Sequence, residues 1–149
     1  MLFRIATITD IPQIQIVRNS VKENQLSDPS VVSDKDVEDY LTRRGKGWVC
    51  EINNKLVGFA IVSILDNNVW ALFIDPEYEG LGIGKRLHAE MMNWYFTKTG
   101  EMIWLSTAPE TRAASFYRKA GWRESGLLKN GELKFEMKKE NWSEIISEK

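Results

Sequence analysis

The sequence predicts an α+β protein with one mixed sheet, in the element order β-α-α-β-β-β-α-β-α-β-β. An apolar run at residues 69–74 passes through a glycine-rich turn into a long helical pattern at residues 81–97. A short apolar run at residues 102–107 follows, and a strand–helix–strand crossover of this kind places its two strands parallel. Asn53-Asn54 and Asn130-Gly131 each separate two strand-like runs, and both pairs suit tight antiparallel hairpins.

The N-terminal part is expected to supply one strand and two helices. Residues 2–8 alternate as in a strand, and Thr9 or Asp10 can cap a first helix that runs to about Glu23. Ser33 is expected to cap the second helix, because its hydroxyl can accept a hydrogen bond at a helix start. The remaining elements are three antiparallel strands, a helix and a final hairpin, at residues 48–52, 55–65, 69–74, 111–120, 122–128 and 132–138.

Length and charge favour a single globular domain. The 149 residues are enough to bury roughly two thirds of the unfolded surface around one core, which we expect at residues 1–139. Residues 140–149 form a polar tail around Trp142, and the sequence leaves open whether the tail docks as a helical turn or frays. The net charge of −1 gives no electrostatic basis for binding nucleic acid or an anionic membrane surface.

The apolar pattern and the cysteine content predict a cytoplasmic protein. Met1-Leu2-Phe3-Arg4 leads into polar residues, so no signal peptide is expected, and no run approaches the ~18 apolar residues of a membrane span. Cys50 is the single cysteine, which excludes an internal disulfide and fits a reducing compartment. We expect it to be a buried thiol, and no Cys/His cluster suggests a metal site.

The turn at residues 80–85 has the chemistry of an anion site. Its three glycines allow positive φ and a close approach of a ligand to the backbone. The helix that follows begins with N–H groups that have no intrahelical partner, which favours phosphate, and Lys85 adds positive charge. A P-loop would need Ser or Thr after Gly-Lys, and a dinucleotide fingerprint would need a third glycine in register; neither is present. An ordinary strand-to-helix turn is the alternative.

Two segments resemble the motifs of a known family. Residues 79–84 are similar to the signature [QR]-x-x-G-x-[GA] of the GNAT superfamily of acetyl-CoA-dependent acyltransferases, with a departure at Glu79. A second segment is similar to the family pattern A-x-x-x-Y-x-x-x-G-[FW], at Ala113, Tyr117, Gly121 and Trp122. Glu110 stands where that family often has Asn. Together with the element order, the resemblance covers most of the chain.

The resemblance implies a three-layer fold and acetyl-CoA (coenzyme A) as cofactor. In the family two central parallel strands splay apart, here those at residues 69–74 and 102–107, and pantetheine inserts between them. The pyrophosphate would lie on residues 80–85, and the thioester near a backbone N–H that can hold an oxyanion. The residues expected at the cofactor are Leu72, Phe73, Ile74, Gly80, Leu81, Gly82, Ile83, Gly84, Lys85 and Arg112. Lys119 is a further candidate for the phosphates; solvated surface charge is the alternative for it and for Arg112.

Tyr117 is the expected catalytic residue. A phenol with a reference pKa near ~10 can donate a proton to a departing thiolate, although a packing role in the helix stripe is the alternative. The general base stays open among Glu51, Asp75 and Glu110. His88, the single histidine, is expected to have no chemical role.

The expected function is N-acetylation of a primary amine by direct transfer from acetyl-CoA in a ternary complex. The alternative is a non-catalytic acyl-CoA-binding or sensing module of the same fold. The acceptor is a small-molecule or peptide amine, and a homodimer stays open. An acidic stretch at residues 23–38 could attract a cationic amine, with a solvated acidic helix start as the simpler interpretation. Its acidic residues are Glu23, Asp28, Asp34, Asp36 and Glu38, set against Lys22 just before it and Lys35 within it.

Overall fold

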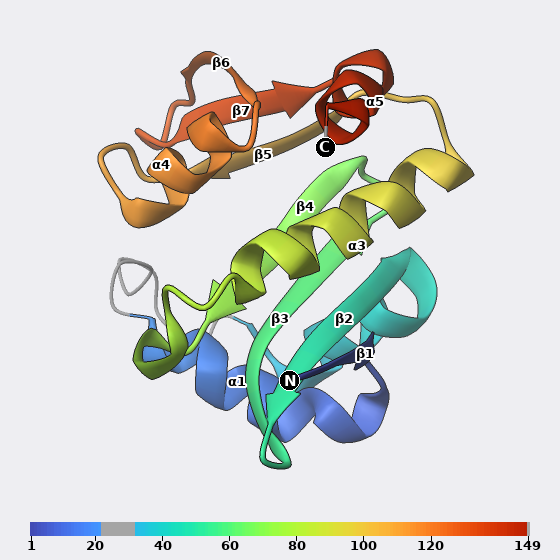
Figure 1. Cartoon of the computed structure of the whole chain (residues 1–149), viewed down its shortest axis with the longest axis vertical. Helices are drawn as coiled ribbons and strands as arrows, with labels where there is room; N and C mark the ends of the chain where they lie inside the picture. Colours follow the sequence, from blue (N-terminus) through green and yellow to red (C-terminus); the bar gives the residue numbers. More distant parts are fainter. Residues whose placement is uncertain (22–31, 149) are drawn as a thin grey trace.

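A computed structural model describes residues 1–21 and 32–148 and contains one mixed sheet with helices on both faces (Figure 1). The strand order is β1-β2-β3-β4-β5-β7-β6. The strands are β1 (Leu2–Ile5), β2 (Gly45–Ile52), β3 (Lys55–Ser63), β4 (Asn68–Ile74), β5 (Ile103–Thr107), β6 (Arg123–Leu127) and β7 (Leu133–Met137). The helices are α1 (Ile11–Ser20), α2 (Asp34–Asp39), α3 (Ile83–Lys98), α4 (Arg112–Lys119) and α5 (Lys139–Ser147). The expected α+β class and element order are confirmed.

The sheet separates two apolar cores. Buried residues of α3, α4 and α5 pack on one face, and those of α1 and α2 pack on the other. Gly58 lets α3 approach β3 closely, since a Cβ there would lie 2.8 Å from Ile74 Cδ1 and 3.2 Å from Ile83 Cγ2. The start of α3 is thereby held against the end of β4, which positions the glycine turn between them.

The two central parallel strands diverge. β4 and β5 share a single pair of partners, Asn68 and Trp104, and separate toward their C-terminal ends (Figure 1). A small cavity of about 70 Å³ lies between the diverging ends. The splayed arrangement expected from the family resemblance is confirmed.

A bulge in β4 changes which side chains face α1 and α2. Ile61 is opposite Ala71 whereas Val62 is opposite Val69, so Trp70 has no partner on β3. The extra residue places Trp70 in the same core as Ala71, on the face of α1 and α2. Val69, Leu72 and Ile74 pack in the other core, on the face of α3. Two large aromatic side chains, Trp70 and Phe73, therefore lie on the α1/α2 face.

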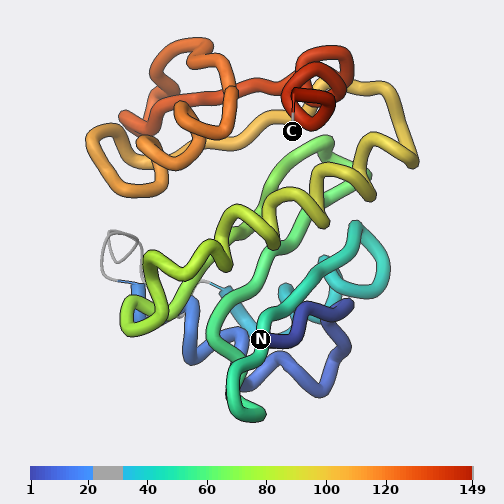
Figure 2. The backbone as a smooth tube through the Cα atoms, viewed as in Figure 1, coloured from blue at the N-terminus to red at the C-terminus, as the bar shows by residue number. Residues whose placement is uncertain are grey.

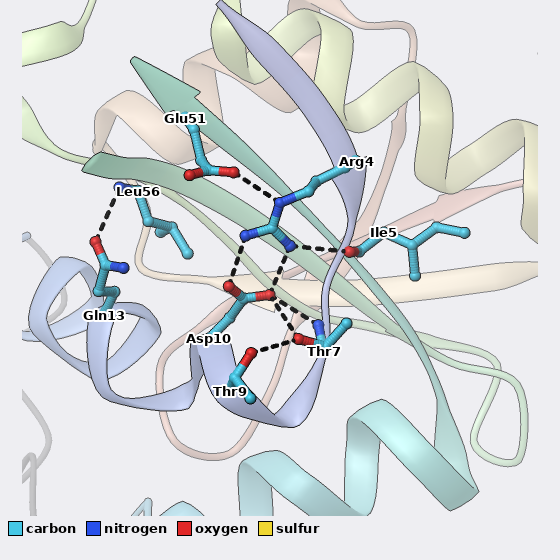
Figure 3. A network of polar contacts seen from close by, with 8 residues as sticks. All are labelled: Arg4, Ile5, Thr7, Thr9, Asp10, Gln13, Glu51 and Leu56. Atoms are coloured by element: carbon cyan, nitrogen blue, oxygen red, sulfur yellow. Dashed lines mark hydrogen bonds and ion pairs between the residues drawn. The ribbon is translucent and has the colours of Figure 1, made fainter. Parts of the chain in front are cut away.

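The first helix begins differently from the expectation. β1 ends at Ile5, and a 3₁₀ turn at Ile8–Asp10 precedes α1. Asp10 does not cap α1: its carboxylate accepts a hydrogen bond from the Thr7 N–H at 2.8 Å and two from Arg4 (Figure 3). The expected cap at Thr9 or Asp10 is therefore wrong, because Arg4 captures the carboxylate from β1. The hydrogen bonds from Arg4 also hold the pKa of Asp10 below its usual range.

The second helix has the expected cap, and several boundaries move slightly. Ser33 Oγ accepts from the Asp36 N–H at 3.1 Å. α2 then continues into a π-helical turn, Tyr40–Arg44, and β2 starts three residues before the expected position. Both residues of the Asn53-Asn54 turn have positive φ, as the hairpin requires. Residue 23 and most of the predicted loop at residues 24–32 lie outside the described residues.

The C-terminal segment docks as a helix. α5 continues from β7, away from the N-terminal strand (Figure 2). Trp142 is buried in the α3 core, and its Nε1–H donates to Asn93 Oδ1 on α3 at 2.9 Å. Of the two outcomes left open by the sequence, docking is the one observed. Among the helices of residues 1–21 and 32–148, none combines the length and apolar character that crossing a bilayer requires.

Candidate functional site

The glycine turn delivers free backbone donors at the start of α3. Gly80 and Gly82 have φ of +79° and +81°, values that favour glycine, and a 3₁₀ turn at Pro76–Tyr78 leads into them. α3 begins at Ile83, two residues later than expected, and its first α-helical bond runs from Arg86 N to Gly82 O at 3.1 Å. By helix geometry, the N–H groups of the first three helical residues have no acceptor within the helix. Together with the helix dipole they favour an anion.

One large cavity adjoins this helix start. Its volume is about 720 Å³, and it is bounded by the end of β4, the glycine turn and the first half of α4. The lining residues are Val21, Leu72, Phe73, Ile74, Pro76, Glu79, Gly84, Arg112, Ala113, Phe116 and Tyr117. Ligands of open α/β sheets commonly bind beyond the carboxyl ends of parallel strands, which is where this cavity lies.

The residues expected from the sequence are brought together only in part. Those that line the cavity are Leu72, Phe73, Ile74, Gly84, Arg112 and Tyr117. Gly80, Leu81, Gly82 and Lys85 form the exposed part of the turn beside it. Ile83 is 1% exposed and packs in the core, so its backbone N–H, and not its side chain, is available to a ligand. Lys119 is exposed and lies outside the cavity lining.

Tyr117 lies where the two cavities meet. It lines both the large cavity and the small one between β4 and β5. Its ring is held by Phe116 and Trp122, with centroids at 5.3 Å and 5.5 Å. Burial raises the pKa of Tyr117, because the phenolate would be poorly solvated there. The phenol therefore stays protonated at neutral pH and can serve as a proton donor.

Glu79, the position that departs from the family signature, is paired. Its carboxylate forms an ion pair with Arg112 at the start of α4. Both residues line the large cavity. The negative charge that the sequence places beside the glycine turn is thus offset by a guanidinium from another element, although both side chains are partly exposed and solvent screens the pair.

None of the three candidate bases lines the large cavity. Glu51, on β2, accepts from Arg4 Nε at 2.7 Å (Figure 3). Asp75 caps the 3₁₀ turn by accepting from the Glu77 N–H at 3.0 Å. Glu110 is exposed and has a φ of +62°.

His88 and Cys50 are buried away from solvent. His88 Nε2 accepts a hydrogen bond from Trp122 Nε1 at 2.9 Å, and the imidazole packs against Phe116 and Trp142. This acceptor role requires the neutral imidazole. Cys50 is 0% exposed, and burial raises the pKa of its thiol. The expectation of a buried thiol is confirmed.

The acidic stretch does not reach the large cavity in the part that the structure describes. Asp36 accepts from the Ser33 N–H, and Asp34 accepts from Gln15 Nε2 at 3.3 Å. Lys35, Glu38 and both of these carboxylates are absent from the cavity lining. Lys22, Glu23 and Asp28 lie outside the described residues.

Several residues that line the large cavity were not predicted from the sequence. Val21, Pro76, Ala113 and Phe116 line the cavity without having been predicted there. Ala113 and Phe116 carried a signal, because they share a helical stripe with Tyr117. Val21 carried none, since its place depends on how α1 packs against β4.

The splayed sheet and the cavity at the start of α3 define the acyltransferase fold that the two motifs indicated. The model of the Acetyltransferase (GNAT) family matches residues 15–122, well over half of the chain. The chain therefore belongs to the GNAT acetyltransferase family.

Three individual relatives share between 21% and 32% sequence identity with this chain. A [ribosomal protein bS18]-alanine N-acetyltransferase of Haemophilus influenzae is 32% identical over 80 residues, which are 52% of this chain. The chain spans about half of that relative, 55% of its length. A PaiA N-acetyltransferase of Thermoplasma acidophilum, solved with coenzyme A, superposes with a TM-score of 0.78 at 21% identity, covering 93% of this chain and 99% of that one. A ribosomal-protein-alanine N-acetyltransferase of Brucella melitensis superposes at 0.74 with 22% identity, over 93% and 99% of the two chains.

Proposed function

We propose that this protein transfers an acetyl group from acetyl-CoA to a primary amine, by direct attack in a ternary complex. One observation carries the proposal: a single cavity connects the anion-favouring start of α3 to a buried phenol at the opening between two splayed strands. Family membership supports the reaction class, and the coenzyme A in the Thermoplasma acidophilum structure supports the cofactor.

The residues present fit coenzyme A. Gly84 lines the cavity without a side chain, so a diphosphate can approach the first N–H groups of α3. The cavity volume of about 720 Å³ is in the range of sites for small molecules and cofactors. Leu72, Phe73 and Ile74 provide an apolar wall toward the gap between β4 and β5.

Acetyl-CoA supplies the activated acetyl thioester. The contribution of this chain is to fix the thioester and amine together, which is worth up to about 7–11 kcal/mol in favourable cases. Tyr117 holds a proton that a departing thiolate can take, and a backbone N–H near Leu72 and Phe73 of β4 can stabilise an oxyanion. The amine would lose its proton to solvent water, since Glu51, Asp75 and Glu110 do not line the large cavity, and Glu79, which does, is held in an ion pair with Arg112.

The acceptor is a small-molecule or peptide amine, and the protein acts in the cytoplasm. The Haemophilus influenzae relative is named for an alanine of a ribosomal protein, which supports a peptide amine as one option. The alternative function is a non-catalytic acyl-CoA-binding module. The relatives' names and the protonated phenol at the strand opening support the transferase.

Incubation with acetyl-CoA and a panel of amines, followed by detection of free thiol, tests the proposal. Release of thiol that depends on the amine, together with the acetylated amine by mass spectrometry, is the expected result. Binding of coenzyme A without transfer to any small or peptide amine would contradict the enzyme and favour the binding module.

A further inference from the structure

Arg18 of α1 lies between the two aromatic side chains of the bulged strand. Its guanidinium carbon is 5.3 Å from the centre of the Trp70 ring and 5.1 Å from that of Phe73. Tyr40 stacks on Trp70 with a centroid distance of 3.9 Å and an interplanar angle of 8°, which fixes the indole. Cation–π contacts stabilise a guanidinium while leaving its N–H donors unused.

Within residues 1–21 and 32–148, the donors of Arg18 find no acceptor. Arg18 makes no hydrogen bond or ion pair with the residues that the structure describes, and its Nη1 is buried without a partner. Burial lowers the pKa of Arg18, and no carboxylate of the described part of the chain offsets this effect. A half-buried guanidinium without a counter-ion is costly, so such a group favours binding an anion.

Arg18 does not itself line either cavity, but it contacts one residue that lines the large cavity and lies one helical turn from another. Phe73, which contacts the guanidinium, lines both cavities. Val21 follows Arg18 by three residues, about one helical turn, and lines the large cavity. Arg18 therefore lies on the α1 side of β4, across the strand from the core that holds α3.

We propose that Arg18 binds an oxyanion of the acceptor, so that the preferred substrates are small primary amines that also carry a carboxylate. The inference rests on the proposed acetyl transfer and adds the substrate class. It does not depend on the acidic stretch, whose Asp34 and Asp36 are engaged in contacts within the N-terminal segment. A planar guanidinium offers two parallel N–H donors to a carboxylate, a match that a neutral amide lacks.

The test compares matched amines on matched variants. Acetyl transfer is measured for glycine against glycinamide, for β-alanine against β-alaninamide, and for O-phosphoethanolamine against ethanolamine. The variants are Arg18→Met, which keeps an apolar stem over Trp70, and Arg18→Lys, which keeps the charge. Arg43→Met, at an exposed ion pair with Asp39, is the control for losing a surface charge.

Wild type should prefer the carboxylate amine over its amide by at least about tenfold in kcat/KM. Arg18→Met should remove that preference mainly through KM, Arg18→Lys should restore part of it, and Arg43→Met should keep it. Equal rates for acid and amide in wild type, or a preference that survives Arg18→Met, would overturn the proposal. A preference confined to the phosphate amine would also overturn it, since phosphate and not carboxylate would then be the ligand.

A binding measurement separates this inference from the proposed reaction. Calorimetry in the presence of coenzyme A compares N-acetylglycine with N-acetylglycinamide on wild type and Arg18→Met. Tighter binding of the acid that disappears in Arg18→Met supports the inference even if no acetyl transfer is found. The double variant Glu23→Gln/Asp28→Asn should keep the preference for the acid; its loss would indicate that carboxylates of the chain, and not Arg18 alone, set the selectivity.

Discussion

Glu79 and Arg112 form an ion pair that connects the glycine turn to the first residue of α4, and both side chains line the large cavity. Glu79 therefore places a negative charge beside the region where a diphosphate is expected, and it also holds a guanidinium that could otherwise bind that diphosphate. The charge arrangement of this site differs from the family signature at this position.

Glu79→Gln should tighten coenzyme A binding about 3–10-fold, because it removes both the repulsion of the phosphates and the carboxylate that pairs with Arg112. The gain should shrink as salt is raised, since both groups are partly exposed. Calorimetric titration at two salt concentrations measures it. Glu77→Gln, an exposed neighbour outside the cavity lining, is the matched control. Weaker binding by Glu79→Gln would mean that the carboxylate contributes to the site.

Tyr117→Phe should lower kcat by about 10²-fold and leave the affinity for coenzyme A near that of wild type, because the change removes a proton donor and keeps the ring. Burial raises the pKa of Tyr117, so the phenol stays protonated and its ionisation should not limit the rate below about pH 10. The pH profile of kcat checks this. Tyr78→Phe, outside the cavity lining, should be neutral. An unchanged kcat in Tyr117→Phe would exclude the phenol from the reaction.

Because Tyr95 is buried, we expect the free energy of unfolding to fall at alkaline pH. Burial raises its pKa to about 12, while an unfolded tyrosine titrates near ~10. The folded state keeps the proton that the unfolded chain releases, so the stabilisation is complete below about pH 10 and falls as the pH rises toward 12.

Urea unfolding between pH 8 and pH 11 measures the effect. Tyr95→Phe should be less stable than wild type at pH 8 by about 1 kcal/mol, because it loses the 2.9 Å bond to Asn67 Oδ1. It should then lose less stability than wild type as the pH rises. Parallel curves for the two proteins would show that Tyr95 does not ionise on unfolding.

Trp142→Ala tests whether α5 belongs to the folding unit. Removing a buried tryptophan should cost about 3–5 kcal/mol, and Trp142→Phe only about 1 kcal/mol for the bond to Asn93. Ile146→Ala, at an exposed position of the same helix, should change the free energy of unfolding by less than about 0.5 kcal/mol. Equal stability of Trp142→Ala and Ile146→Ala would mean that the domain ends before α5.

Much of the fold was predictable because its signals are local. The asparagine turns, the glycine turn and the Ser33 cap depend on side chains within a few residues of one another. The contacts of Asp10 with Arg4 and Thr7 were not predictable, because they depend on Arg4 of β1 reaching the start of α1. The sequence did not decide whether residues 140–149 dock or fray, because one tryptophan in a polar segment does not show that it has a binding partner. In the structure Trp142 donates a hydrogen bond to Asn93.

The residues of the site that belong to a sequence motif could be predicted. Those brought there by tertiary packing could not. Gly84 and Tyr117 were expected from the family motifs, and both line the cavity. The Glu79–Arg112 pair joins residues 33 positions apart, and neither residue type indicates its partner. Arg18 was missed because its place depends on a bulge in β4, which leaves no trace in a short apolar run.

The central claim is that coenzyme A binds against the start of α3. Gly84→Ala tests it without disturbing the fold, because the added Cβ would make only ordinary contacts, 3.6 Å from Phe116 and 3.7 Å from Ile74, while filling space in the cavity. Gly100→Ala, with one contact at 4.0 Å, is the control. Calorimetric titration should give one coenzyme A per chain for wild type and Gly100→Ala, and at least about tenfold weaker binding for Gly84→Ala at an unchanged melting temperature. No heat of binding in wild type, or equal affinity in Gly84→Ala, would contradict the account.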